Sequence, residues 1–263
     1  MEHELWPAAL LNQYLAGPAN TVLSWAGMKA ADPAHPWANF VALEILVALI
    51  VVVVFALLRP RLSMDRPGKL QHVFELITGF VTGQSDDVIG QRGRTHVSFF
   101  ATLFIFILFS NLLGLIPTLE SPTMFPAVPL GCALAAFAYY NVAGIRSQGL
   151  GHYLKHFAGP MLVLAPLMFP IELISNFSRL LSLTIRLYAN MFAGERVTLA
   201  FIGLAPLLVP LPFMGLHIFV AFLQAYIFML LTMIYVDGAI GEEHVQEHSS
   251  RLNNEAASVS PAA

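Results

Sequence analysis

The sequence predicts an all-α membrane protein with five transmembrane helices and one interfacial amphipathic helix. The last two of the five are long and tilted, and they form a hairpin. Two observations predict this class. Apolar residues make up 57% of the chain and charged residues only 11%, against about 25% charged in an ordinary soluble domain. Several apolar runs also reach the ~20 residues that a helix needs to cross a bilayer. A soluble globular fold is therefore excluded.

Five long apolar segments are interrupted by polar loops and proline-rich turns. The predicted spans cover residues 40–58, 97–117, 127–145, 171–203 and 213–237. Pro206, Pro210 and Pro212 separate the last two, as expected for a turn between helices. The fourth segment, taken as one helix, measures ~50 Å against a hydrocarbon core of ~30 Å. It must therefore tilt strongly or break.

Residues 69–89 form a shorter segment that is too polar to span. Its apolar positions recur at helical spacing, which is typical of an amphipathic helix lying in the membrane interface. The apolar positions are Leu70, Val73, Phe74, Ile77 and Val81, opposite Gln71, His72 and Glu75. Residues 1–38 are predicted to form an extracytoplasmic N-terminal segment, and residues 241–263 a polar cytoplasmic tail.

Basic residues gather in alternate loops, which predicts the orientation. The loop between the first two spans carries Arg59, Arg61, Arg66, Lys69, Arg92 and Arg94. The next loop has Glu120 and no lysine or arginine, and the third carries Arg146 and Lys155. By the positive-inside rule, the first and third loops face the cytoplasm. The N-terminus is therefore expected outside and the C-terminus inside.

Arg186 lies in the middle of the fourth apolar segment. A guanidinium keeps its charge in a protein, and placing one at the centre of a membrane helix costs at least ~2.5 kcal/mol. Such a residue indicates function and requires a partner. At ~100° per residue, a polar stripe accompanies it within about 40°, whereas Glu195 projects to the opposite side. The stripe consists of Glu172, Ser175, Arg179, Ser182, Asn190 and Ala193.

The last span repeats this pattern with His217 and Gln224 on one face. His217 lies near its outer end, and its side chain titrates near physiological pH. If the turn at residues 206–212 faces outward, Glu195 and His217 lie at similar depth. The pair is a candidate proton relay.

The sequence argues against a disulfide, a zinc-peptidase site, and nucleotide or nucleic-acid binding. Cys132 is the only cysteine, so an internal disulfide is impossible. His244-Val-Gln-Glu-His248 matches a zinc-peptidase pattern, but it falls in the polar tail without a further ligand. No nucleotide motif and no basic patch with interleaved aromatic residues occurs, so neither cofactor, metal nor nucleic acid is expected. The chain is not predicted to be an enzyme on its own.

The segment Ser182-Leu-Thr-Ile-Arg186-Leu-Tyr-Ala-Asn190-Met-Phe-Ala-Gly-Glu195 resembles the signature of ATP synthase subunit a, the stator channel of F-type ATP synthases. Glu172 upstream, His217 with Gln224 downstream, and Asn111-Leu-Leu-Gly-Leu-Ile-Pro117 fit the same pattern. The resemblance covers about residues 97–243. Five spans, an outside N-terminus and an inside C-terminus match the bacterial form, which implies the cell inner membrane.

The resemblance implies a role for each polar residue and a set of partners. Arg186 matches the essential arginine that faces the carboxylates of a rotating ring of c subunits. Glu195 and His217 would serve the outer half-channel, with Asn190 and Gln224 near the arginine. Glu172 and Ser182 would serve the inner half-channel. The implied partners are the c-ring, the peripheral stalk b subunits and the rest of the ATP synthase. One departure is Gly114, because some bacterial relatives have a carboxylate in this segment.

Two other functions remain open on the residues alone. The chain could be a secondary transporter that binds an anionic substrate at Arg186, although no internal repeat is visible. It could also be a membrane scaffold. Single residues have structural alternatives too. Arg186 could pair with a carbonyl or a fixed carboxylate, and Arg179 could reach the cytoplasmic interface or pair with Glu172. His217 could be a packing residue, and Asn190 and Gln224 interhelical contacts.

Overall fold

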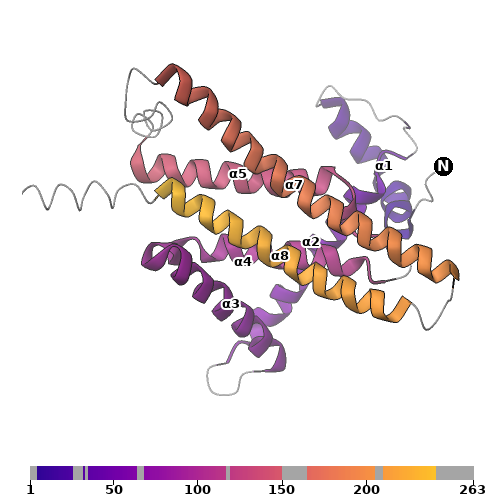
Figure 1. Cartoon of the computed structure of the whole chain (residues 1–263). Helices are drawn as coiled ribbons and strands as arrows, with labels where there is room; N and C mark the ends of the chain where they lie inside the picture. Colours follow the sequence, from indigo (N-terminus) through magenta and orange to yellow (C-terminus); the bar gives the residue numbers. More distant parts are fainter. Residues whose placement is uncertain are drawn as a thin grey trace, which may run out of the picture.

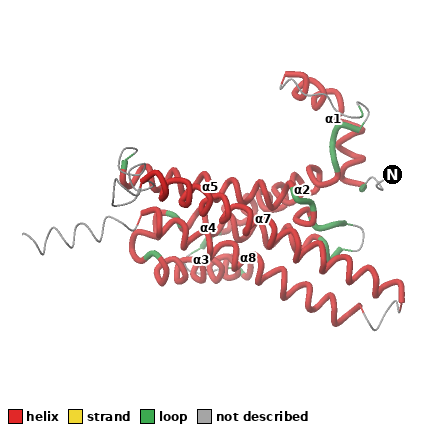
Figure 2. Tube along the Cα trace, turned by 45° about the horizontal axis from the view of Figure 1, so that its top comes forward, coloured by secondary structure: helices red, strands yellow, loops and turns green. Residues whose placement is uncertain are grey.

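The computed structural model describes residues 5–25, 32, 35–63, 68–116, 119–149, 165–204 and 210–240. Within these residues all regular structure is helical, and strands are absent (Figure 2). The α-helices are α1 (Trp6–Trp25), α2 (Asn39–Leu58), α3 (Lys69–Val88), α4 (Val97–Leu113), α5 (Ala127–Gln148), α7 (Ala165–Leu204) and α8 (Pro210–Ile240). Short 3₁₀ turns are η1 (Arg59–Arg61), η2 (Gly90–Thr95) and η3 (Pro122–Met124). The predicted all-α class is confirmed.

Most helix bounds follow the hydropathy, and the differences have physical causes. Helix α7 begins six residues before the predicted start and continues through Pro170 as one helix. Helix α8 begins at Pro210. Pro210 and Pro212, which the sequence assigned to the turn between the last two spans, therefore lie in the first turn of α8. Proline is tolerated there because first-turn N–H groups have no partner within the helix. Helix α4 ends at Leu113, four residues before the predicted end.

Helix α1 lies in the segment for which the sequence analysis assigned no helix. It is joined to the start of α2 by two polar side chains. The amide of Asn12 pairs with the backbone of Trp37, donating at 3.3 Å and accepting at 2.9 Å. The side chain of Asn39 accepts a hydrogen bond from the backbone N–H of Leu5 at 3.1 Å. These contacts place α1 across the end of α2 (Figure 1).

Three helical stretches are long and apolar enough to cross a membrane. They are Asn39–Leu58, Ala127–Gln148 and Leu211–Ile240. Helix α4 is equally apolar but has 17 residues. Helix α7 has 40 residues, about 60 Å at 1.5 Å per residue, and carries five charged side chains. Five crossings therefore remain a prediction.

The core joins α4, α5, α7 and α8, which pack against one another (Figure 1). Its largest fully buried side chains include Phe100, Phe104, Leu187, Met191, Met229 and Met233. In Figure 1, α7 is unbroken, crosses α5 obliquely and lies beside α8. The alternative of a broken fourth helix is wrong, because the stretch between Pro170 and Gly194 contains no helix breaker.

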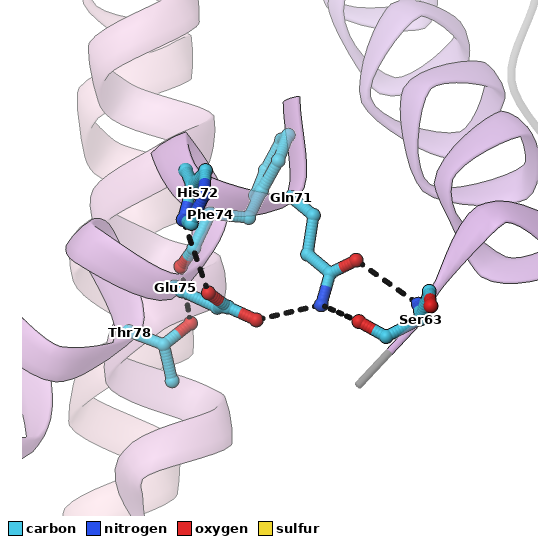
Figure 3. Close-up of polar contacts among 6 residues, drawn as sticks. All are labelled: Ser63, Gln71, His72, Phe74, Glu75 and Thr78. Carbon is cyan, nitrogen blue, oxygen red and sulfur yellow. Dashed lines mark hydrogen bonds and ion pairs between the residues drawn. The ribbon is translucent and has the colours of Figure 1, made fainter. Parts of the chain in front are cut away.

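The amphipathic helix α3 packs with Val81 buried and with Phe74 and Ile77 partly buried, while Leu70 and Val73 are exposed. One feature departs from the prediction: Gln71, which was assigned to the polar face, is buried. The amide of Gln71 accepts a hydrogen bond from the N–H of Ser63 and donates to its C=O, both at 3.1 Å. It also donates to Glu75 at 2.7 Å (Figure 3). Gln71 is therefore buried because it satisfies the backbone that leads out of η1.

We expect Gln71→Leu to lower the free energy of unfolding by about 1–3 kcal/mol, because two backbone groups of Ser63 lose their partner. Thermal unfolding of the purified chain in detergent measures this. Gln91→Leu is the matched control, since Gln91 is exposed. Equal melting temperatures for the two variants would contradict the role of Gln71.

Candidate functional site

Arg186 lies on a face of α7 that no other described helix covers. Its neighbours on the helix surface, Ser182 and Asn190, are exposed with it. The exposed part of the helix also carries large apolar side chains, among them Ile174 at 68% exposure and Ile185 at 58%. Leu183, Leu187 and Met191, which lie about 60–140° round the helix from Arg186, are buried. Arg186 thus lies on an open side of α7 that carries both polar and large apolar side chains.

Within the described part of the chain, the guanidinium of Arg186 forms no ion pair with a carboxylate. The alternative of a structural arginine held by a fixed acid therefore has no support there. Arg179 does not pair with Glu172. Its guanidinium carbon instead lies 5.2 Å from the ring centroid of Tyr235 in a cation–π arrangement. Arg196 lies similarly over Phe192, at 5.1 Å.

Glu195 is buried on the side of α7 away from Arg186, as its helical position predicts. It lines a cavity of about 220 Å³ together with His217 of α8 and Glu120 of the loop after α4. The backbone N–H of Ser121 points to its Oε2 at 3.4 Å. The structure therefore brings Glu195 and His217 together, and it adds Glu120 to them.

His217 also lines a second cavity of about 240 Å³, whose lining includes Asn190, Gly194 and Val197. The ring packs against the backbone of α7, with Nδ1 only 3.0 Å from the point where a Cβ on Gly194 would lie. Its Nε2 is buried without a hydrogen-bond partner in the described residues. The imidazole of His217 therefore presents an unpaired nitrogen, Nε2, at a residue that lines both cavities.

A chain of buried hydroxyl and amide groups continues from Glu195 toward α8. Ser121 Oγ donates to the C=O of Ser110 at 3.0 Å and lies 2.7 Å from Thr123 Oγ1. Thr123 donates to Asn111 Oδ1 at 2.6 Å, and Asn111 donates to the C=O of Ala221 at 3.2 Å. The sequence analysis did not single out Ser121 or Thr123. Their only signal was a pair of hydroxyls beside Glu120.

Close packing against Ser121 explains why residue 114 is a glycine. A Cβ at this position would lie 2.9 Å from Cβ and 3.1 Å from N of Ser121. Since Ser121 N–H is directed at Glu195, a larger side chain at position 114 would displace the loop that contacts the acid. A carboxylate in this segment does not fit the loop as it stands, and the buried acid here comes from α7.

The remaining predicted site residues, Glu172, Ser182 and Gln224, do not lie together. Glu172 accepts a hydrogen bond from Asn176 Nδ2, at 3.4 Å on Oε1 and 3.1 Å on its C=O. Asn176 Oδ1 accepts from Tyr140 at 2.8 Å. Ser182 does not join this network and lies on the exposed face one turn before Arg186. Gln224 is buried on α8.

No cluster of metal-ligating side chains occurs in the ranges that the structure describes. His244–His248 lie outside those ranges.

Comparison with known proteins decides the family. The family described as "ATP synthase A chain" matches residues 41–237, which is about three quarters of the chain. The chain belongs to this family. A protein of Solibacter usitatus named "ATP synthase subunit a" is 60% identical over 235 residues, which cover 89% of this chain and all of the relative. A protein of the same name from Koribacter versatilis is 51% identical over 244 residues, 93% of this chain and all of the relative.

A more distant member of the ATP synthase A chain family, "ATP synthase subunit a 3" of Pelobacter propionicus, is 44% identical over 76% of this chain and 86% of its own length. These relatives are bacterial, and three helical stretches here are apolar enough to cross a membrane. The chain is accordingly a bacterial membrane protein. The resemblance stated from the Arg186 segment is confirmed at the level of the family.

We expect Gly114→Ala to destabilise the chain by about 1–3 kcal/mol, because the added methyl group overpacks the contact with Ser121. Thermal unfolding in detergent measures the change. Gly131→Ala is the control, since nothing lies within 4 Å of a Cβ built there. A control that melts as low as Gly114→Ala would contradict the packing explanation.

Proposed function

We propose that this chain is the proton-translocating stator subunit of the membrane sector of a bacterial F-type ATP synthase. Its partners would be the c-ring, the peripheral stalk b subunits and the rest of the complex, and ATP chemistry would take place on other subunits. The observation that carries the proposal is Arg186, a permanent cation on an exposed side of α7 with no carboxylate of the described chain paired to it. Such a cation suits an acid on a moving partner.

Arg186 would act in two ways on a ring carboxylate. Its fixed charge stabilises the ionised carboxylate, so an arriving acid gives up its proton there. The same charge repels a proton or hydronium ion, so it separates the two access paths. A charge that crosses the full membrane potential gains ~2.3 kcal/mol per 100 mV. Rotation is driven because protons can pass only by way of the ring.

The outer half-channel is assigned to the two cavities beside His217. A proton would enter at Glu120 and Glu195, pass to the imidazole, and reach the second cavity that Asn190 lines. Imidazole suits this step because one ring nitrogen can accept a proton while the other releases one. The free Nε2 and the absence of a side chain at Gly194 both support the assignment. Gln224 would lie near the end of this path.

The inner half-channel is assigned to the other end of α7. Glu172, with the buried Asn176 and Tyr140, forms a partly buried polar group on that part of the helix. Ser182 lies apart from this group, on the exposed face between it and Arg186. The N-terminus would lie outside and the C-terminus in the cytoplasm, with five crossings of the inner membrane.

A secondary transporter is less well supported. An anionic substrate would need a cavity around its cation, because ligand sites enclose most of the ligand surface. Arg186 does not line any of the five main cavities found among the described residues. An open face fits a large protein partner better than a small solute.

We expect Arg186→Gln to abolish ATP-driven proton pumping, because the ring carboxylate is no longer forced to ionise as it passes. Fluorescence quenching in inverted membrane vesicles that carry the whole complex measures pumping. Arg196→Gln is the control: it removes the same charge from the same helix, near its outer end. Coupled pumping by the Arg186 variant at the normal rate would overturn the proposed mechanism.

We expect His217→Ala and Glu195→Gln each to lower proton flux by about tenfold or more, the usual range for a proton-transfer group being 10²–10⁴. Passive proton flow through the membrane sector, after removal of the catalytic head, reports this directly. Unchanged flux in both variants would remove the outer path from the proposal.

A glycine pair tests the position of His217 without changing a titratable group. Gly194→Ala places a methyl group against the imidazole and should also lower flux. Gly215→Ala adds the same methyl group to α8 in open space and should leave flux unchanged. Equal flux in the two glycine variants would show that the imidazole need not lie where it does.

A further inference from the structure

A third cavity, of about 420 Å³, lies away from the proton path, where η2 and the start of α4 meet the ends of α5 and α8. Its polar lining consists of Arg92, Thr95, His96, Tyr139, Arg146 and Ser147. None of its described lining residues is acidic. Figure 1 shows the C-terminal ends of α5 and α8 at the same end of the bundle. We propose that this cavity binds the phosphate headgroup of an anionic phospholipid.

The positive charge of the cavity comes from Arg92 and Arg146. Both side chains are exposed, so they can reach a headgroup that enters from the membrane edge. Their neighbour Arg94 does not line the cavity, and its guanidinium bonds to Asp86 at 3.1 and 3.2 Å. Burial lowers the pKa of His96, which favours its neutral form. Guanidinium groups bind phosphate through paired N–H donors, which fits this lining.

The N-terminal end of α4 adds to the positive electrostatic potential of the cavity. Its first residue, Val97, follows the lining residue His96, and no side chain caps the helix there. The N-terminus of a helix carries partial positive charge and free N–H groups, which favour a phosphate group. The His96 ring is held in place by Tyr139, with Nδ1 and the phenol oxygen 2.7 Å apart. The Tyr139 ring in turn stacks on Phe99 with centroids 3.6 Å apart.

The apolar surroundings favour a lipid over a soluble phosphate. Val142, Ala143 and Ile240 form the apolar part of the lining. An exposed row of Leu134, Ala138 and Val142 leads along α5 to Arg146 in steps of four residues. This row is about 18 Å long at 1.5 Å per residue, against ~15 Å for one leaflet of the hydrocarbon core. A headgroup at Arg146 would therefore lay its acyl chains along α5.

The site goes beyond the proposed function and does not depend on proton flow. Native mass spectrometry of the full chain in detergent tests it, with phosphatidylglycerol and phosphatidylcholine of matched acyl chains as probes. We expect at least about a tenfold preference for phosphatidylglycerol, since each basic residue adds to anionic lipid binding. The double variant Arg92→Gln/Arg146→Gln should lose this preference, whereas the control Arg94→Gln should keep it.

A preference that persists in the double variant, or that falls equally in Arg94→Gln, would overturn the site. Inorganic phosphate at millimolar concentration separates the two sources of the ligand. If it displaces phosphatidylglycerol completely, the site binds a soluble anion and the lipid assignment fails. Should the double variant not fold, Arg146→Glu and Arg146→Lys replace it. The first should lose the preference and the second should retain it, and equal binding by both overturns the proposal.

A photoreactive side chain at position 142 in the complete ATP synthase identifies the occupant in place. An adduct with lipid is the expected result. An adduct with another protein subunit would show that the row on α5 is a protein interface instead.

Discussion

The function proposed for the chain depends on a charge with which no carboxylate of the described residues pairs. A guanidinium keeps its charge in a protein, and Arg186 is exposed on α7. A membrane cation without a partner is unfavourable by several kcal/mol. In the proposed mechanism, the ring of c subunits supplies the anion. This requirement connects the composition of α7 to the function proposed for it.

One side of α7 packs against the bundle, and the exposed side carries Arg186. The helix packs against α5 and α8 through Leu183, Leu187 and Met191, and its exposed side is the one that the proposed partner would contact. Glu195 lies on the packed side, where α8 and the loop after α4 enclose it. An acid on the open side would instead pair with Arg186 or compete with the partner. The spacing of nine residues between the two charges keeps them on opposite sides of one rigid helix.

Much of the fold could be predicted, because hydropathy and helical period depend on local sequence. The bounds of α2 and α3 agree within one residue at each end, and the opposed positions of Arg186 and Glu195 follow from helix geometry alone. Helix α1 was missed because it is mixed in polarity and contains Pro18. Ser121 and Thr123 were missed for another reason. They lie in and beside a loop, where no period reveals that the N–H of Ser121 contacts an acid 74 residues later in the chain, or that the hydroxyl of Thr123 bonds to Asn111.

The contact between Gly114 and Ser121 shows how such a non-local arrangement becomes consistent. The loop approaches α4 so closely that only a hydrogen fits at position 114, and this approach directs the N–H of Ser121 at Glu195. The acid of the cavity therefore stands on α7, beside the imidazole of α8, and not on α4. A carboxylate on α4 would require a looser loop, and Glu195 would then lose its one backbone donor. The position of the acid and the absence of a side chain at 114 are thus two results of one packing constraint.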